Sequence, residues 1–339
     1  MSDPLSPASY APYPSVEEYI LDWTDRIWAD GAIGDIAGMY AADLPVRTAS
    51  GVGVGVEGVI RGSLAKKAAF LHRIGVGEDV VWESRGPSSF VSHHRVLHTG
   101  AQHGPWAYGP TTGRAAVSRN LPVCLVEDAM VTEEWVVRDE WAVVEGLGHD
   151  PSAVAIAAPV DLSPLGAGGI FGRPAPADPV LEGDSGPRPA THREEATFVA
   201  SLWSDVVRER RFDRVPDFYS RDCIVHTSRN RTVTRLDGVR GDLMELLAPF
   251  PDAEVNVRDI AVHRSPDRGL RASVMWQLRG TYSGLPVYGT PRGERVEVLG
   301  VSQYELEGGR VRREYRIFDE IAVLAQIEAQ RARQGVTPS

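Results

Sequence analysis

The stretch Glu133 to Glu145, EEWVVRDEWAVVE, recurs in recognisable form at Arg313 to Ala325, REYRIFDEIAVLA. In both copies an acid, Asp139 or Asp319, stands where a strand-like run gives way to a helix-like run. The chain is therefore predicted to contain one fold written twice. Five identities are separated by 180 residues, namely Glu134, Asp139, Glu140, Ala142 and Val143 against Glu314, Asp319, Glu320, Ala322 and Val323.

The same spacing extends over most of both halves of the chain. VEEYILDWTDRIW after Ser15 matches EEATFVASLWSDVVRER from Glu194, and YGPTTG at 108–113 matches YGTPRG at 288–293. Helical periodicity and long alternating runs joined by glycine-marked turns predict, in each copy, three helices, an antiparallel meander and a closing helix. The predicted fold class is α+β, with two tandem cone-shaped barrels, each having three helices on a curved antiparallel sheet around a pocket.

The register of the repeat also predicts the domain boundaries. We expect an N-terminal tail at 1–14, a first and more diverged copy at 15–149, a linker at 150–192, a second copy at 193–331 and a C-terminal tail at 332–339. The linker is crowded with Pro, Gly and Ala and is longer than a compact connection needs, so it either crosses a neighbouring surface or is mobile. Four apolar residues could hold it down, namely Ile170, Phe171, Val180 and Leu181.

Composition excludes several functional classes. Of 339 residues, 42% are hydrophobic and 24% charged, which is typical of a soluble globular protein. No apolar run is long enough to span a bilayer, and the N-terminus does not resemble a secretory signal, so a cytoplasmic protein without a membrane role is expected. A net charge of -10 disfavours nucleic acid as a partner. Cys124 and Cys223 fall in different copies and are predicted to be buried thiols.

Two further patterns invite cofactor hypotheses that their context does not support. Gly53, Gly55 and Gly58 have the dinucleotide-binding spacing, but the equivalent segment of the second copy, RTVTRLDG, lacks these glycines, which favours a loop. A histidine cluster lacks the cysteine or carboxylate that would complete a familiar metal-ligand spacing, so no metal is predicted. The cluster comprises His93, His94, His98 and His103.

The second copy resembles the SnoaL-like polyketide cyclases of the nuclear transport factor 2-like superfamily. The resemblance implies a cone-shaped barrel that usually dimerises through its sheet and has a deep apolar pocket. It also implies an aspartate that acts as acid and base on an activated carbonyl compound, without metal or organic cofactor. That aspartate falls on Asp319, and on Asp139 in the first copy. The resemblance rests on Asp222 to His226, Pro249 to Asp252, Gly280 to Gly284, Tyr288 to Gly293, and Glu314-Tyr315 followed by Asp319.

Strand periodicity gives Asp319 two possible roles. Tyr315, Ile317 and Asp319 alternate on one face of the last strand, and an acid beside Tyr and Ile in a poorly solvated cavity has the raised pKa that proton transfer near neutral pH requires. Asp is also a preferred helix N-cap, so Asp319 and Asp139 are equally interpreted as caps of the closing helices. His226, at a strand end, could assist the acid or simply be satisfied there.

Further side chains are predicted to bind the substrate or to belong to the core. In the second copy the aromatic candidates are period-two residues that could line a pocket or pack in the interior. In the first copy Arg47 occupies the position of His226 and could bind an anion or pair with a carboxylate. The remaining substrate-binding candidates are Trp276, Tyr282, Tyr288, Tyr304 and Tyr315, together with His94, His98, Tyr108 and Trp135.

Two hypotheses about function follow. The first is a cofactor-independent enzyme of the SnoaL type, a cyclase, isomerase or hydrolase that acts on a small apolar carbonyl compound, with Asp319 as acid and base, His226 assisting and Asp139 the corresponding residue of the first copy. The second is a non-catalytic module that binds a ligand or a protein, in which two joined cones mimic a homodimer. A pocket shared by Asp319 and His226 favours the enzyme, whereas a filled cone favours the module. The two copies could pair within one chain or through a homodimer.

Overall fold

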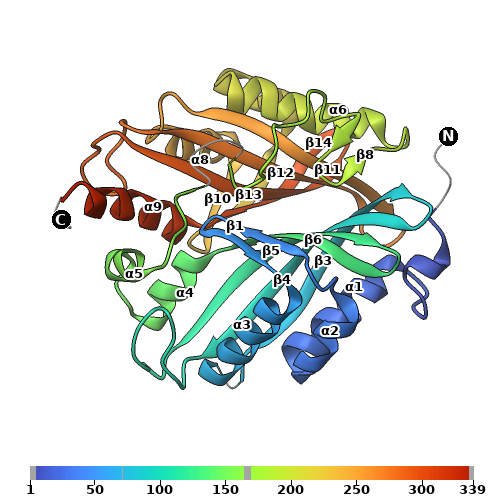
Figure 1. Cartoon of the computed structure of the whole chain (residues 1–339). Helices are drawn as coiled ribbons and strands as arrows, with labels where there is room; N and C mark the ends of the chain where they lie inside the picture. Colours follow the sequence, from blue (N-terminus) through green and yellow to red (C-terminus); the bar gives the residue numbers. More distant parts are fainter. Residues whose placement is uncertain (1–4, 71, 164–168, 336–339) are drawn as a thin grey trace.

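The computed structural model describes residues 5–70, 72–163 and 169–335. The predicted tails at 1–14 and 332–339 and the linker at 150–192 each extend partly outside these ranges. The α+β fold class is confirmed, with two six-stranded sheets and helices on the outer side of each (Figure 1).

The first copy begins with a helix that the sequence explains. The Ser15 hydroxyl caps the helix by accepting a hydrogen bond from the Glu18 amide at 3.1 Å, and Val16, Tyr19 and Ile20 are buried. The helix ends in a π-helical turn over Arg26–Asp30. The elements of this copy are α1 (Val16–Asp25), α2 (Ile36–Met39), β1 (Pro45–Thr48), β2 (Gly51–Val54), α3 (Val56–Ala69), β3 (Ile74–Gly86), β4 (Ser89–Ala101), β5 (Ala115–Glu127), β6 (Met130–Arg138) and α4 (Glu140–Leu147).

The second copy repeats this order with longer closing elements. Its predicted long strands are confirmed, and the glycine-marked turn between the last two has Gly308 and Gly309 at φ 57° and 71°, in the left-handed region that glycine adopts at little cost. Its elements are α6 (Arg193–Ser201) with a π-helical continuation over Leu202–Arg208, α7 (Val215–Phe218), β9 (Tyr219–Thr227), β10 (Arg231–Thr234), α8 (Arg235–Leu247), β11 (Glu254–Ser265), β12 (Gly269–Tyr282), β13 (Glu294–Glu307), β14 (Arg310–Phe318) and α9 (Glu320–Arg333).

The two sheets have the same topology. The strand orders are β2-β1-β6-β5-β4-β3 and β10-β9-β14-β13-β12-β11. In each sheet one pair of strands is parallel, β1 with β6 and β9 with β14, and the other pairs are antiparallel. The segment that carries the repeated motif therefore lies at the centre of each sheet, at the end of β6 or β14.

The sheets pack against each other through the faces that point away from their own helices. A buried cluster combines residues of both copies, including Val123 and Trp135 from the first and Met275, Val301 and Ile317 from the second. Polar contacts cross the same layer, since His93 Nδ1 lies 2.9 Å from Ser273 Oγ and Arg95 donates to Gln303 at 2.7 Å. The helices α1 to α3 cover one outer side and α6 and α8 the other (Figure 1).

The segment 150–192 is anchored on both copies. It contains α5 (Pro151–Ala157) and a short ribbon of β7 (Glu182–Gly183) and β8 (Gly186–Pro187). Of the apolar residues expected to hold it, Ile170 and Phe171 are buried in the cluster between the sheets, whereas Leu181 is exposed. Arg188 pairs with Glu83 of the first copy at 2.8 Å, and the Ser185 amide donates to Asp259 of the second at 2.8 Å. The described part of this segment thus crosses the surface of both copies, as one of the two expectations stated.

Candidate functional site

The face of β14 that was expected to line a pocket lies between the two sheets. Ile317 belongs to the cluster between the sheets, and the Arg95 guanidinium lies 3.5 Å from the centre of the Tyr315 ring. Tyr315 is therefore not a pocket residue, which corrects that expectation. Alternation along the strand was predicted correctly, but the sequence did not reveal which face points into the cone. The cone face carries Glu314, Arg316 and Phe318.

Asp319 caps the closing helix, as one of the two interpretations of the sequence stated. Its Oδ1 accepts a hydrogen bond from the Ala322 amide at 3.0 Å at the start of α9. Burial raises the pKa of Asp319 to about 8, and the nearby charge of Glu140 in the first copy raises it as well. The carboxyl group therefore holds its proton near neutral pH, which suits both a buried cap and a proton donor.

Asp139 caps α4 in the same way but has additional partners. Its carboxylate accepts from the Ala142 amide at 3.3 Å and, across the contact between the copies, from the amides of Arg229 at 2.9 Å and Asn230 at 3.0 Å. The residue is 1% exposed. Burial raises the pKa of Asp139 to about 6, while the three amide hydrogen bonds lower it. These contacts make Asp139 a structural connection between the copies.

His226 lies on the same side of the sheet as Tyr315. The two rings stack with centroids 4.7 Å apart, and His226 Nδ1 is 3.0 Å from Thr232 Oγ1. Burial and the positive charge of Arg119 lower the pKa of His226, so the ring is neutral near pH 7. The cavity of the second cone, described next, is bordered by neither His226 nor Asp319.

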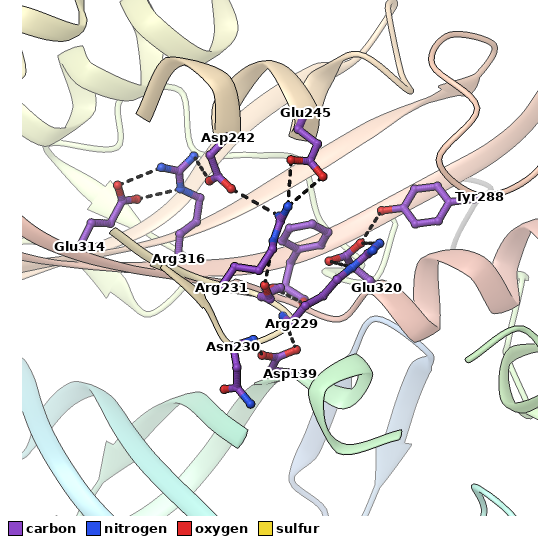
Figure 2. A network of polar contacts seen from close by, with 12 residues as sticks. Asp139, Arg229, Asn230, Arg231, Asp242, Glu245, Tyr288, Glu314, Arg316 and Glu320 are labelled. Carbon is purple, nitrogen blue, oxygen red and sulfur yellow. Dashed lines mark hydrogen bonds and ion pairs between the residues drawn. The ribbon is translucent and has the colours of Figure 1, made fainter. Parts of the chain in front are cut away.

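A narrow polar cavity lies in the second cone beside α8. Figure 2 shows the charged residues around it. The cavity has a volume of about 20 Å³, which is room for about one water molecule. Leu246, Val287 and Phe318 supply its apolar wall. Its polar lining comes from the β9–β10 turn, α8, β14, α9 and the loop before β13, and includes Arg229, Arg231, Asp242, Tyr288, Arg316 and Glu320.

Arg316 is the charged centre of this cavity. Its side chain is 1% exposed and forms two hydrogen bonds with Glu314, at 2.9 and 3.0 Å. Tyr219 donates to the same carboxylate at 2.7 Å. The remaining guanidinium nitrogen, Nη1, has no hydrogen-bond partner among the described residues and lies 3.5 Å from Asp242 Oδ2. A buried donor without a partner is costly, so this nitrogen is suited to hold an oxygen atom of a bound molecule.

Asp242 is the acid that faces Arg316 across the cavity. It is 6% exposed, and its ion pairs with Arg316 and Arg231 are long, at 3.5 and 3.4 Å. Burial raises the pKa of Asp242, while the two arginines lower it. Asp242 was not among the site residues predicted from the sequence. A signal was present, because Asp242 falls on the buried stripe of α8 with Val239 and Leu246, where an acid is unusual.

The second acid of the cavity is Glu320, which directly follows Asp319. Its carboxylate accepts from Tyr288 Oη at 3.1 Å and from Arg229 Nε at 3.0 Å, and it forms a second contact with the Arg229 guanidinium. Of the predicted aromatic residues, Tyr288 therefore does border a cavity. Arg231 lies at the mouth, where both oxygens of Glu245 accept from it at 2.8 Å (Figure 2).

The other aromatic candidates of the second copy fill the cone. The rings of Trp203 and Trp276 are 5.1 Å apart, and Trp203 donates to Tyr304 Oη at 2.8 Å. Tyr282 packs on Phe250, and its hydroxyl accepts from the Tyr288 amide at 2.8 Å. Trp276, Tyr282 and Tyr304 are thus core residues, the alternative that the sequence analysis left open, because their side chains occupy the space that a substrate would need.

The candidates of the first copy are dispersed. Trp135 is fully buried between the sheets, so the expectation that it binds substrate is wrong. Arg47 pairs with Glu133 at 2.6 Å and donates to the Ile170 carbonyl at 2.7 Å, which is the carboxylate pairing considered from the sequence. His94 is buried beside Ser92, and burial lowers its pKa to about 3. Only His98 and Tyr108 lie near a cavity, that of the first cone.

Within 5–70, 72–163 and 169–335, no group of three or more His, Cys, Asp or Glu side chains is arranged to hold a metal ion. No helix in the part of the chain that the structure describes is long and apolar enough to cross a membrane. Both cysteines, Cys124 and Cys223, are buried free thiols, as predicted.

Comparisons with known proteins identify one family. The sequence model of the SnoaL-like polyketide cyclases matches residues 197–327. No curated protein sequence matches the chain.

Similar solved structures each cover less than half of the chain. One, from Jannaschia sp. CCS1 and provisionally named a SnoaL-like polyketide cyclase, is 23% identical over 42% of this chain and 96% of its own, with a TM-score of 0.37. TsrD from Streptomyces laurentii is 19% identical over 43% and 98%, with a TM-score of 0.36. A SnoaL-like polyketide cyclase from Agrobacterium tumefaciens is 20% identical over 39% and 96%, with a TM-score of 0.31.

Proposed function

Since residues 197–327 match the sequence model of the SnoaL-like polyketide cyclases, we propose that the protein is a cofactor-independent enzyme that performs acid-base chemistry on a small apolar carbonyl compound in the second cone. One observation carries this proposal. Arg316 and Asp242 line the same cavity, which also has apolar walls. Arg316 Nη1 has no hydrogen-bond partner among the described residues, and burial raises the pKa of Asp242. Such a pairing of a proton acceptor with an oxyanion-stabilising donor is what enolisation of a carbonyl compound requires.

The proposed reaction is a proton transfer. Asp242 as the carboxylate takes a proton from the carbon next to the carbonyl group, and the electron pair moves onto the carbonyl oxygen, where Arg316 Nη1 stabilises the negative charge. The enolate then attacks a second carbon in a cyclisation, or is reprotonated by Asp242 in an isomerisation. The proton that Asp242 gained returns to the product, so the enzyme ends in its starting state.

The substrate enters by displacing a side chain at the mouth. The cavity of about 20 Å³ is smaller than a ketone, and the Arg231–Glu245 ion pair covers its opening. The side chain of Arg231 is 35% exposed, and an exposed ion pair contributes little to stability. Rotation of Arg231 toward solvent is therefore the least costly route to a wider cavity.

A competing assignment gives the proton transfer to Asp319 with help from His226, as the family resemblance implies. Its support is the pKa of Asp319, raised to about 8. The competing residues lie on the other side of the sheet from Asp242, so single substitutions distinguish the two sites.

Exchange of the α-protons of cyclopentanone in D₂O, followed by NMR, tests the proposal without knowledge of the natural substrate. We expect the protein to accelerate exchange above buffer, Asp242→Asn to lose at least about tenfold of that rate, and Asp319→Asn and Asp139→Asn to retain it. Asp237→Asn, at an exposed position on the same helix, is the matched control. Loss in Asp319→Asn with retention in Asp242→Asn would transfer the role to Asp319.

The filled interior supports a second candidate, a non-catalytic module whose two sheet-packed copies form the intramolecular equivalent of a homodimer. The rings of Trp203, Trp276 and Tyr304 leave only the narrow cavity described above. Absence of exchange with acetone, cyclopentanone and cyclohexanone alike, together with recovery of a bound protein or metabolite on the intact chain, would favour this module over the enzyme.

A further inference from the structure

The first cone contains a cavity with a charge pattern of its own. It lies between α3, the strands β4 and β5, and α4, and has a volume of about 20 Å³. Phe70, Ala116 and Val143 form its apolar wall. Its ionisable lining comes from Lys66, Arg73 and Glu140, with the ring of His98 beside them. None of these residues takes part in the function proposed above.

Two cations of the lining, Lys66 and Arg73, lie near one carboxylate, Glu140, and the positive charge of Arg138 acts on all three groups. Lys66 Nζ lies 3.6 Å from Glu140 Oε1, and the two side chains are 16% and 15% exposed. Tyr108 donates its hydroxyl to the same carboxylate. Glu140 is therefore already engaged by two partners, and its single negative charge cannot neutralise a second cation nearby.

Arg73 is the cation without a counter-charge. It is 8% exposed, lines the cavity, and makes no side-chain hydrogen bond or ion pair with any described residue. Its guanidinium lies over the Trp28 ring at 5.3 Å, which leaves the edges of the planar group free to donate. Burial lowers the pKa of Arg73 to about 10 and that of Lys66 to about 8, although the charge of Glu140 raises both. A buried guanidinium without a partner is rare and points to a missing acceptor.

The two cones share one pair of side chains but differ in the residue of the third helix that faces it. Both keep a tyrosine bonded to the first glutamate of the closing helix, Tyr108 with Glu140 and Tyr288 with Glu320. The helix position that holds Lys66 in the first copy holds Glu245 in the second. In the first cone Lys66 of this helix pairs with the shared glutamate, whereas in the second cone the matching helix position holds an acid and Arg229 of the β9–β10 turn pairs with the glutamate instead.

We propose that the first cone binds a small monocarboxylate, with the Arg73 guanidinium and the Lys66 ammonium holding its two oxygens and Phe70 and Val143 beside its apolar end. The planar fork of arginine matches a carboxylate in two parallel hydrogen bonds. The cationic lining favours an anion over a neutral ligand, and the cavity of about 20 Å³, room for about one water molecule, must widen to admit even acetate. This proposal is independent of acid-base chemistry in the second cone.

The sequence provides a selective reporter, because Lys66 and Lys67 are its only lysines. Lys67 points elsewhere, since its ammonium donates to the carbonyls of Trp28 at 3.0 Å and of Ala29 and Arg73 at 3.4 Å. Full-length protein labelled with ¹⁵N at the lysine Nζ atoms therefore gives two side-chain NMR signals, one inside the site and one internal reference.

The test is a titration of this labelled protein with acetate, and separately with acetamide, its neutral analogue. Acetate should shift the Lys66 signal saturably and raise the pKa of Lys66 by about one unit, because an anion beside an ammonium favours its charged form. The Lys67 signal should not move. An equal response to acetamide, or no saturable response to acetate, overturns the proposal without any need for a variant.

Variants and other anions sharpen the result. Arg73→Gln should weaken acetate binding at least about tenfold, the value of a lost charge-assisted hydrogen bond. Arg61→Gln, at an exposed position of α3, the helix that carries Lys66, should leave it unchanged. Chloride and inorganic phosphate are titrated in parallel. If chloride or phosphate saturates the shift of the Lys66 signal at the same concentration as acetate, the site binds anions in general. That result would overturn the assignment to carboxylates.

Discussion

Asp139 and Asp319 hold the same position in the two copies, yet their surroundings differ. Each accepts a hydrogen bond from the amide three residues on, at the start of the closing helix. Asp139 also accepts hydrogen bonds from the backbone amides of Arg229 and Asn230 in the second copy. Among the described residues, the Asp319 carboxylate accepts a hydrogen bond only from its own helix. The identical residue in the two motifs therefore has the same role as a helix cap, while its further contacts depend on the residues around it.

The same lesson applies inside the cones. The tyrosine and glutamate that both copies keep form the same contact twice, but the residues of the third helix that face this pair have changed. Ser63 and Lys66 in the first copy stand where Asp242 and Glu245 stand in the second. The two copies thus share the same backbone fold but differ in the charged side chains inside their cones. For this reason we propose different ligands for the two cones.

Replacement of the paired tryptophans should give the largest difference between the copies. Trp203 is 2% exposed, stacks on Trp276 and donates to Tyr304, so Trp203→Ala should lower the free energy of unfolding by about 4 kcal/mol. Trp23, its counterpart, is half-buried beneath Arg26, and Trp23→Ala should cost about 2 kcal/mol. Urea unfolding followed by circular dichroism measures both. Equal losses would mean that the two cones are packed alike.

Removal of the two helix caps should also lower the free energy of unfolding by different amounts in the two copies. Asp139→Ala leaves three backbone amides without their acceptor and should cost about 3 kcal/mol, the sum of a cap and two buried hydrogen bonds. Asp319→Ala removes one amide contact and should cost about 1 kcal/mol. The same urea experiment compares the two variants. A larger loss in Asp319→Ala would reverse the structural ranking of the two acids.

Much of the fold follows from the sequence for physical reasons. The 180-residue register predicted two copies because helix caps and strand alternation must recur where the backbone recurs, and Ser15 and Asp139 are observed as caps. Alternation along β14 correctly grouped Tyr315 with Ile317. It could not tell which face lies inside the cone, because one face carries apolar and aromatic residues that pack between sheets and the other carries a buried ion pair, Glu314 with Arg316.

The candidate site was less predictable because its residues come from separate elements. Asp242 lies on α8 and Arg316 on β14, and only the folded sheet brings them to 3.5 Å. Burial of an ion pair in a cone interior departs from the usual hydrophobic pattern, so neither Asp242 nor Arg316 was predicted as a site residue. An acid within an apolar helical stripe was the one local signal that could have identified Asp242.

The pH dependence of stability should give the smallest difference and tests the raised pKa of Asp319. The usual pKa of this side chain is 3.8, and in the folded protein it is about 8. Between these values the folded state keeps a proton that the unfolded chain has released, so this group's contribution to stability is present below about pH 4 and is lost as pH rises through 8. Asp319→Asn removes that titration and retains a good N-cap.

We therefore expect Asp319→Asn to match the wild type at pH 5 within about 0.5 kcal/mol and to be more stable at pH 9 by about 1 to 2 kcal/mol, well below the full shift because the residue is only half-buried. Urea midpoints at pH 5, 7 and 9 measure the change, with the exposed Asp237→Asn as a control that should show none. Asp139, whose pKa is about 6, titrates in both proteins, and its charge is one of the causes that raise the pKa of Asp319. Parallel curves for Asp319→Asn and wild type would mean that Asp319 ionises without penalty, which would make it an ordinary cap like the other helix-capping acids and remove its claim to the proton transfer.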